Sequence, residues 1–221
     1  MKHALIIGHT GGIGAALAAH LAAQGVAVTG LSRRTHGLDL TDEASIARVI
    51  GCEDGPFDTV FVATGALELG PHRPEKALRA VTAGALAAQF ALNATGPVLV
   101  LKHALRLLPR DRPARFAALS ARVGSIGDNR LGGWYSYRAA KAALNQLIHS
   151  AAIEVARSHP QAVVVTLHPG TVDTGLTANY RGDHVAMPPA EAAAHLLRVL
   201  HGLTPQDSGG FFDWRGDRVP W

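Results

Sequence analysis

A tyrosine and a lysine four residues apart are the pair in this sequence best suited to acid–base chemistry. Tyr137 and Lys141 stand in an alanine- and leucine-rich stretch that is typical of a helix, so both side chains are expected on one helix face. An ammonium group beside a phenol favours the phenolate and lowers a tyrosine pKa that starts near about 10. We therefore expect Tyr137 to act as a general acid or base with help from Lys141. The alternative is two unrelated side chains on a solvated helix.

A glycine-rich turn near the N-terminus is the second candidate for chemistry. A short apolar run at residues 3–7 leads into this turn, and an alanine-rich helix to about Gln24 and a strand at residues 26–31 follow it. Glycines spaced as G-x-x-x-G-x-G between a strand and a helix let the backbone approach a pyrophosphate at the helix N-terminus. The turn therefore predicts a dinucleotide site. The residues expected to contact the cofactor are Gly8, Thr10, Gly12, Ile13 and Gly14, and His9 is a weaker candidate for contact with a phosphate.

The residues after the second strand indicate which dinucleotide is bound. NAD sites place a carboxylate there for the ribose 2′-hydroxyl, whereas this chain has Ser32, Arg33 and Arg34. Two guanidinium groups suit a 2′-phosphate, so we expect NADP(H) rather than NAD(H). The alternative is two solvated surface arginines. Asp39 and Leu40 are expected near the adenine, although Asp39, like Thr41, also suits a helix cap.

Short apolar strands alternate with helices along the chain. Besides the first two strands, we expect strands at residues 37–42, 58–63, 116–120, 162–167 and 209–214, and helices at about 42–50, 74–108, 137–158 and 190–201. This alternation predicts an α/β fold, a Rossmann-type doubly wound parallel sheet of about seven strands with helices on both faces. The second and third strands are too close in sequence for a helix, so that crossover is expected to be trimmed.

Ligands on such sheets bind at the carboxyl ends of the strands, and further candidates stand there. They are Ala63, Thr64 and Gly65 after the fourth strand, Ser120 after the fifth, and Pro169, Gly170, Val172 and Thr174 after the sixth. Asn93 lies within the long apolar helix, where Gly96 and Pro97 are expected to cause a bend. An asparagine there has either a functional reason or caps a broken helix. The polar, irregular residues 174–188 suit a lid.

The composition limits the other classes of function. The chain has 221 residues, of which 48% are hydrophobic and 17% charged, which suits one α/β domain over residues 1–221. The basic residues are scattered and the 12 His show no ligand spacing, so neither a nucleic-acid partner nor a metal is expected. A single cysteine, Cys52, and no signal-like or membrane-spanning apolar run favour the cytoplasm without a membrane partner.

Together these motifs resemble the short-chain dehydrogenase/reductase family over nearly the whole chain. The resemblance rests on the glycine turn, the serine segment and the Tyr137 and Lys141 pair, with Asp39, Thr64, Gly65, Asn93 and Pro169–Gly170-x-Val172-x-Thr174 in the expected order. The stretches 120–126 and 128–133 and the Trp221 ending are similar to a C-factor-like branch, which resembles small carbonyl reductases such as sniffer.

The resemblance implies an NADP(H)-dependent oxidoreductase that reduces an aldehyde or ketone to an alcohol. Tyr137 would give the carbonyl oxygen a proton, while Lys141 would lower the Tyr137 pKa and hold the nicotinamide ribose. Asn93 would anchor a water in the proton path. Val172 backbone groups would fix the carboxamide, Thr174 would touch the pyrophosphate, and a serine would polarise the carbonyl.

One position departs from the family pattern. The family has a Ser–Ser pair at the end of the fifth strand, and the second, catalytic serine corresponds here to Ala121. Either Ser120, Ser125 or no serine then polarises the carbonyl. Ala121 also leaves open a signalling or regulatory protein that binds the nucleotide with little turnover, since the C-factor branch is tied to intercellular signalling.

Two further expectations concern surfaces. Trp134 and Tyr135 precede the catalytic pair and suit either a substrate pocket or core packing. The helices that carry Asn93 and Tyr137 are more apolar than a monomer needs, so a homodimer or homotetramer is expected. The remaining partner is a small-molecule carbonyl or alcohol substrate.

Overall fold

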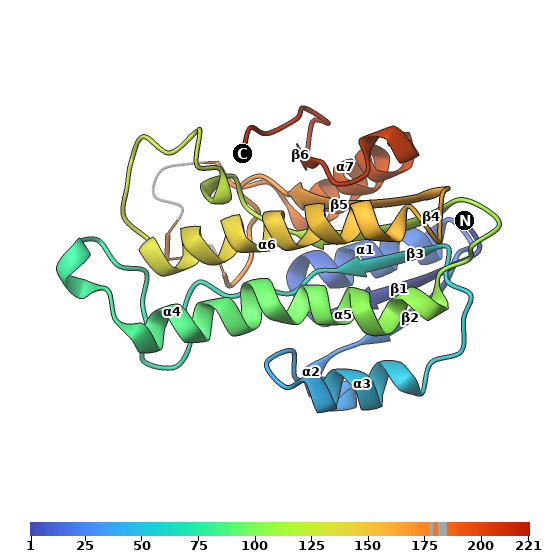
Figure 1. Cartoon of the computed structure of the whole chain (residues 1–221), viewed down its shortest axis with the longest axis horizontal. Coiled ribbons are helices and arrows are strands. Elements are labelled where there is room, and N and C mark those ends of the chain that lie inside the picture. The colour runs from blue at the N-terminus through green and yellow to red at the C-terminus, as the bar shows by residue number, and fades with distance from the viewer. Residues whose placement is uncertain (177–178, 181–184) are drawn as a thin grey trace.

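One parallel sheet organises the chain. The computed structural model describes residues 1–176, 179–180 and 185–221. Within them, six parallel strands follow the order β2-β1-β3-β4-β5-β6. The strands are β1 (His3–Ile7), β2 (Ala27–Leu31), β3 (Thr59–Val62), β4 (Ala114–Leu119), β5 (Ala162–His168) and β6 (Phe211–Asp213). The α/β prediction of a parallel sheet with helices on both faces is confirmed (Figure 1).

The described sheet has six strands rather than about seven because residues 37–42 form no strand. After β2 the chain enters a short helix, α2 (Arg33–His36), which Gly37 ends with a left-handed φ of 64°. The Asp39 amide then donates to Ser45 Oγ and the Thr41 amide to Asp39 Oδ1, at 3.1 and 2.9 Å. Side-chain oxygens thus accept the hydrogen bonds that these amides would donate to a neighbouring strand. The helix α3 (Glu43–Gly51) follows. The expected trimmed crossover is therefore absent.

Two hydrophobic clusters hold helices against the two faces of the sheet. Successive strand residues point to opposite faces, so Leu5 and Ile7 belong to one cluster while Ala4 and Ile6 belong to the other. The first face is covered by α3, α5 (Gly96–Ala104) and α6 (Tyr135–Val155), and the second by α1 (Gly12–Ala23) and α7 (Pro189–Gly202) (Figure 1). Because the strands are parallel, their carboxyl ends share one edge of the sheet.

The long apolar helix begins later than residue 74. Residues 74–82 are a loop with a single 3-10 turn (Leu78–Ala80), and α4 (Ala83–Phe90) starts where Thr82 accepts a hydrogen bond from the Ala85 amide. A π-helical turn (Ala91–Thr95) joins α4 to α5 and contains Asn93, whereas Gly96 and Pro97 form the first turn of α5. Among the described helices, Ala83–Leu107 is long and apolar enough to span a membrane, but Val100, Leu101 and Ala104 pack into the core.

The predicted lid is described only in part. Residues 177–178 and 181–184 of the expected segment 174–188 lie outside the described residues. At its far end, Met187 pairs with the strand exit, because its amide donates to Thr171 and its carbonyl accepts from Asp173. Met187, directly before α7, therefore lies beside residues 171–173, which follow β5.

Candidate active site

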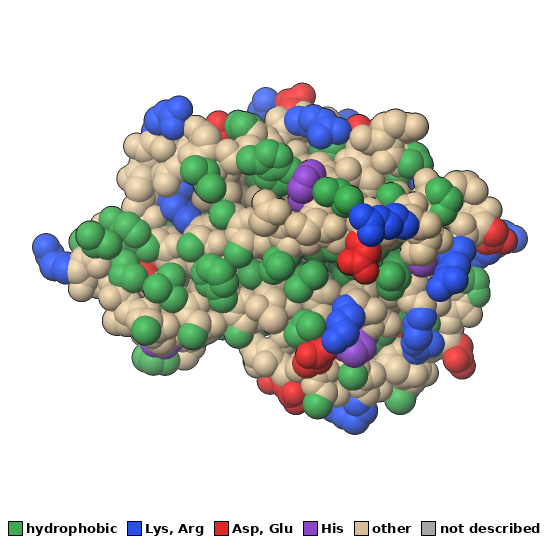
Figure 2. Space-filling view, in the orientation of Figure 1, with side chains coloured by type: hydrophobic (Ala, Val, Ile, Leu, Met, Phe, Trp, Pro, Cys, Tyr) green, Lys and Arg blue, Asp and Glu red, His purple; other side chains and the backbone are tan. Residues whose placement is uncertain are grey.

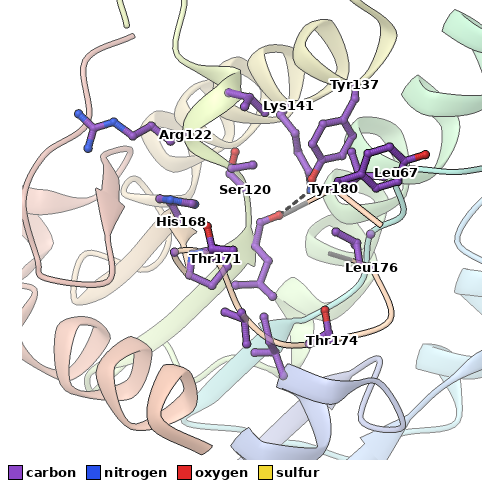
Figure 3. A pocket seen from close by; sticks show the side chains of 18 of the residues that line it. Leu67, Ser120, Arg122, Tyr137, Lys141, His168, Thr171, Thr174, Leu176 and Tyr180 are labelled. Carbon is purple, nitrogen blue, oxygen red and sulfur yellow. Dashed lines mark hydrogen bonds between the residues drawn. The ribbon is translucent and has the colours of Figure 1, made fainter. Parts of the chain in front are cut away.

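A cavity of about 830 Å³ lies at the carboxyl-end edge of the sheet (Figure 3). It is bordered by the segments after β1, β3, β4 and β5 and by the first turns of α6. The sequence-predicted residues that line it are Gly12, Ile13, Ala63, Thr64, Gly65, Ser120, Tyr137, Lys141, Pro169, Gly170, Val172 and Thr174. The structure thus brings together the tyrosine–lysine pair, the serine and much of the expected nucleotide site.

The other predicted residues lie outside this lining. They are Gly8, Thr10 and Gly14 in and after the β1 turn, Ser32, Arg33, Arg34, Asp39 and Leu40 beyond β2, and Asn93 in the π-helical turn. Leu40 is a core residue with 4% exposure. Asn93 is fully buried but touches the cavity wall, because a Cβ added to Gly65 would lie 3.0 Å from its Oδ1.

The glycine turn is shaped as a cradle for an anionic group. A Cβ on Gly14 would lie 2.2 Å from the Gly8 carbonyl oxygen, and a Cβ on Gly12 would lie 2.7 Å from Thr174 Cγ2. Gly11 is the N-cap of α1, and no side chain caps the helix. Its first amides are therefore open to a phosphate. The residues present fit the pyrophosphate of a dinucleotide.

Of the residues expected at the adenosine end, two are exposed arginines, and Ser32 and Asp39 form hydrogen bonds within the chain. Arg33 and Arg34 are exposed on α2, and neither forms a salt bridge within the described part of the chain. Ser32 is buried and caps α2 by accepting from the Thr35 amide at 3.3 Å. Hydrogen bonds from the Thr41 amide and hydroxyl lower the pKa of Asp39. Asp42, rather than Asp39 or Thr41, caps α3.

Tyr137 and Lys141 project from α6 into the same cavity (Figure 3). The Lys141 Nζ lies 5.7 Å from the Tyr137 ring centroid and donates to the Leu119 carbonyl oxygen at 2.9 Å. Tyr137 is 7% exposed and Lys141 is 2% exposed, so both sit in a poorly solvated pocket. The interpretation as two solvated surface residues is wrong.

Burial sets the protonation of this pair. Desolvation raises the pKa of Tyr137 and lowers the pKa of Lys141 to about 7, because an apolar environment disfavours each charged form. The expectation that Lys141 lowers the Tyr137 pKa is therefore wrong for the protein alone. A phenol that stays protonated is nevertheless in the form that a proton donor requires.

Of the two candidate serines, Ser120 and Ser125, one lines the cavity. Ser120 Oγ is buried at the cavity, with no hydrogen-bond partner among the described residues. Ser125 is also buried, but it does not line the cavity, and its Oγ accepts from the Asp128 amide at 3.1 Å. Ala121 lines the cavity without a donor. Ser120 is the described serine placed to meet a ligand.

Asn93 ties the loop after β3 to the π-helical turn. Its Nδ2 donates to the Ala66 carbonyl at 2.9 Å and to Gln89 Oε1 at 2.6 Å, while its Oδ1 accepts from the Ala66 amide at 3.2 Å. Gln89 Nε2 in turn donates to the Leu67 carbonyl at 2.8 Å. The Asn93 side chain is fully engaged in shaping this wall and is not a helix cap.

One wall of the cavity is aromatic and apolar. The Trp134 ring meets Tyr137 and Tyr180 edge-on, with centroids 6.3 and 5.6 Å apart, and Leu67 and Leu176 line the same cavity. The Tyr180 hydroxyl donates to Glu68. Of the two roles expected for Trp134 and Tyr135, pocket lining or core packing, Trp134 takes the first. Tyr135 does not line the pocket. Tyr180 lies in the expected lid segment 174–188, but no motif singled it out as a pocket residue.

The opposite wall carries a polar corner that sequence reasoning missed. Arg122 pairs with Asp128 at 2.7 Å and with Asp213 at 3.8 Å, and His168 lies beside it in the lining (Figure 3). Burial lowers the pKa of His168 to about 4, so this imidazole is neutral at pH 7. Its place at the end of β5, directly before Pro169, was the available signal.

The comparisons with known proteins establish the family. The sequence profile of the short chain dehydrogenase family matches residues 35–184. The 1-hydroxy-2-glutathionyl-2-methyl-3-butene dehydrogenase of Rhodococcus sp. (strain AD45) is 32% identical over 92% of this chain and 84% of its own length. The chain belongs to the short-chain dehydrogenase family of oxidoreductases.

Relatives within the family agree with the predicted branch. The C-signal protein of Myxococcus xanthus is 38% identical over 62% of this chain and 78% of its own length. The carbonyl reductase Sniffer of D. melanogaster shares the fold with a TM-score of 0.82, at 20% identity over 100% of both chains. An NADPH-bound carbonyl reductase from chicken fatty liver has a TM-score of 0.84, at 21% identity over 100% of this chain and 94% of its own. The resemblance to the C-factor-like branch is confirmed, and the fold is shared with the carbonyl reductase Sniffer.

Proposed function

We propose that this protein is an NADPH-dependent carbonyl reductase that converts an aldehyde or ketone to an alcohol. The observation that carries the proposal is the meeting of Tyr137, Lys141 and Ser120 with the glycine cradle in one cavity. An acid and a nucleotide site on one cavity let a hydride and a proton reach the same carbonyl group. Bound NADPH supplies the hydride to the carbonyl carbon.

The side chains around the carbonyl oxygen supply the proton and its stabilisation. The Tyr137 phenol gives its proton to the oxygen as negative charge develops there. The unpartnered Ser120 hydroxyl donates a hydrogen bond to the same oxygen and takes the role that Ala121 lacks. Lys141, anchored on the Leu119 carbonyl, offers its remaining donors to the nicotinamide ribose. The Val172 backbone and Thr174 hold the carboxamide and the pyrophosphate.

The choice of NADPH over NADH rests on Arg33 and Arg34. Both are exposed after β2, where they can donate charge-assisted hydrogen bonds to a 2′-phosphate. The chicken carbonyl reductase of the same fold was crystallised with NADPH. Replacing both arginines by alanine should raise the KM for NADPH about 10- to 100-fold and leave the KM for NADH unchanged. Arg48→Ala, which removes an exposed arginine of α3, should change neither value.

The aromatic and leucine wall defines the substrate side. Trp134, Tyr180, Leu67 and Leu176 present rings and apolar carbons, which favours a carbonyl compound with an apolar or aromatic substituent. A panel of aldehydes, ketones and diketones, followed through NADPH and NADH absorbance, tests this function. We expect turnover with NADPH, best with apolar substrates. The absence of turnover at high enzyme concentration would reject the enzyme proposal.

A second candidate is a regulatory protein that binds the nucleotide with little turnover. Ala121 in place of the catalytic serine and the similarity to C-signal favour it. It predicts that NADPH binds and protects the fold while the whole carbonyl panel remains unreduced. We further propose a cytoplasmic protein, since Cys52 is exposed and free.

A further inference from the structure

The helix that carries Tyr137 begins in an unusual way. Trp134 is its N-cap, with a left-handed φ of 52°, and its side chain caps no amide. Gly132 and Gly133 before it also have φ values of 63°. Trp134 is the one non-glycine with positive φ among the residues that the structure describes. Such a conformation is unfavourable for a non-glycine residue and persists where neighbours hold it in place.

Glu75 supplies the missing cap from the loop between β3 and α4. Its carboxylate accepts a hydrogen bond from the Ser136 amide at 3.2 Å and another from the Ser136 hydroxyl. Its backbone carbonyl accepts from the Trp134 amide at 2.5 Å. The Glu75 side chain is buried, with 5% exposure, and forms no salt bridge within the described residues. The first turn of α6 therefore provides the hydrogen-bond partners of this buried carboxyl group.

The three hydrogen bonds that Glu75 accepts hold the backbone from which the Trp134 and Tyr137 side chains project. Trp134 is held at its amide, and its ring stands edge-on to Tyr137 and Tyr180. Tyr137 follows Ser136 directly, so an anchored Ser136 fixes the backbone that bears the phenol. Arg138 supports the same turn, because its Nε donates to the carbonyls of Gly132 and Gly133 at 3.2 and 3.0 Å.

The same loop is also held at its other end. Asn93 bonds to Ala66, and Gln89 bonds to Leu67, directly after Gly65 in the cavity wall. The loop therefore runs from one wall of the cavity to the start of α6 and is hydrogen-bonded at both places. A displacement of the Glu75 carboxylate would remove the two hydrogen bonds from Ser136 at the α6 end and leave the β3 end in place.

We propose that Glu75 is a positioning residue. From a loop distant in sequence it caps α6 and thereby orients the Tyr137 phenol and the Trp134 ring at the substrate. The proposal rests on the proposed carbonyl reduction, in which Tyr137 is the proton donor. A purely structural role would lower the melting temperature and leave the chemistry of the folded enzyme unchanged. A positioning role lowers kcat at unchanged NADPH affinity, since the glycine cradle lies elsewhere on the cavity.

Glu75→Ala, Glu75→Gln and Ser136→Ala test the proposal, with Glu154→Ala as the matched control. Glutamine keeps an acceptor for the Ser136 amide and a donor for its hydroxyl. Glu154 stands exposed near the other end of the same helix. Each variant is measured for kcat, KM, NADPH Kd and melting temperature. We expect a kcat loss of about 10- to 100-fold in Glu75→Ala, recovery to within about threefold in Glu75→Gln, and wild-type values in Glu154→Ala.

A spectroscopic readout separates this proposal from the proposed function. With Trp214→Phe and Trp221→Phe in the background, Trp134 is the remaining tryptophan, and acrylamide quenching reports its exposure. Glu75→Ala should increase quenching and Glu75→Gln should restore it, even if the wild-type protein reduces no carbonyl compound. Inactivity of the wild type would then count against the enzyme and not against the positioning role.

Several outcomes would overturn the positioning role. They are a folded Glu75→Ala variant with wild-type kcat and quenching, an equal loss in Glu75→Gln, or a matching loss of NADPH affinity. Should Glu75→Ala fail to fold, Ser136→Ala decides. A severalfold lower kcat at unchanged NADPH Kd supports the role, and wild-type kcat and quenching overturn it.

Discussion

At the scale of single residues, burial rather than pairing controls the protonation of the acid–base groups. The Tyr137 pKa is raised and the Lys141 pKa is lowered to about 7, both through desolvation. Tyr137 therefore stays neutral in the protein alone, and Lys141 is about half protonated near pH 7. This suits a phenol that waits as a proton donor and a lysine whose charge responds to what binds beside it.

The buried Lys141 makes stability depend on pH. Its folded pKa of about 7 lies below its ordinary value of 10.5, so the unfolded chain binds more protons between these two values. The free energy of unfolding therefore rises with pH above about 7. From pH 7 to 9 the rise is about 2 kcal/mol, because the slope starts at about half of 1.4 kcal/mol per pH unit at pH 7 and approaches that full value by pH 8.

Lys141→Met removes the group that causes this rise. We expect the variant to be more stable than the wild type at pH 7 and to lack the lysine-dependent rise towards pH 9, as measured by urea unfolding. Lys2→Met, which replaces an exposed lysine, should keep the wild-type slope. Equal slopes in Lys141→Met and the wild type would show that the Lys141 pKa is ordinary in the folded protein.

The sequence predicts the residues that follow a local rule and misses those that depend on tertiary contacts. The four-residue spacing placed Tyr137 and Lys141 on one helix, and the strand-end rule located Ser120 and Pro169. Glu75 obeyed no such rule, because its partner Ser136 is 61 positions away. The Tyr137 pKa was misjudged for a similar reason, since desolvation depends on packing that spacing does not show.

At the scale of elements, the π-helical turn between α4 and α5 couples a helix to the cavity wall. It places Asn93 so that its amide group satisfies both backbone groups of Ala66 and the Gln89 side chain. A buried amide with every partner filled stabilises a fold, whereas removing it leaves those partners unpaired. The turn therefore shapes the wall at Gly65.

Asn93→Ala should be far more costly than the same change at Asn145. Asn145 is buried in α6, but its side-chain atoms have no partner within the described residues. We expect Asn93→Ala to lower the free energy of unfolding by about 2–4 kcal/mol and Asn145→Ala by less than about 1.5 kcal/mol. Denaturant unfolding measures both. Similar losses would mean that the Asn93 network contributes little.

Element boundaries were predicted where caps were recognised. The helices after Gly11 and around Tyr137 were placed well, because glycine and alanine patterns mark them. The helix expected from residue 74 begins at Ala83, since Thr82 rather than Pro74 provides the cap. The supposed strand at 37–42 was wrong because Asp39 and Ser45 side chains bind its amides, and hydropathy alone does not show such bonds.

At the scale of the whole molecule, hydrophobic side chains gather over the face formed by α4, α5 and α6 (Figure 2). Phe90 and Leu147 are 37% exposed and Ile153 is 57% exposed on these helices. We propose that this face joins copies of the chain in a dimer or tetramer.

Leu147→Glu should disrupt that assembly, because it places a charge on the apolar face. We expect light scattering after gel filtration to give an oligomer for the wild type and a smaller species for Leu147→Glu. Ile126→Glu, which changes an exposed residue with 76% exposure outside α4 and α6, should keep the wild-type mass. A monomeric wild type would reject the proposed interface.

The central claim is that Tyr137 gives the proton that completes carbonyl reduction. The direct test compares wild type, Tyr137→Phe and Tyr135→Phe by NADPH consumption and alcohol formation on the best substrate of the panel. Tyr135 stands on the same helix, outside the cavity lining. The account predicts that Tyr137→Phe loses at least about 100-fold in kcat with NADPH affinity retained, and that Tyr135→Phe keeps the wild-type rate. A Tyr137→Phe variant that reduces the carbonyl at the wild-type rate would contradict it.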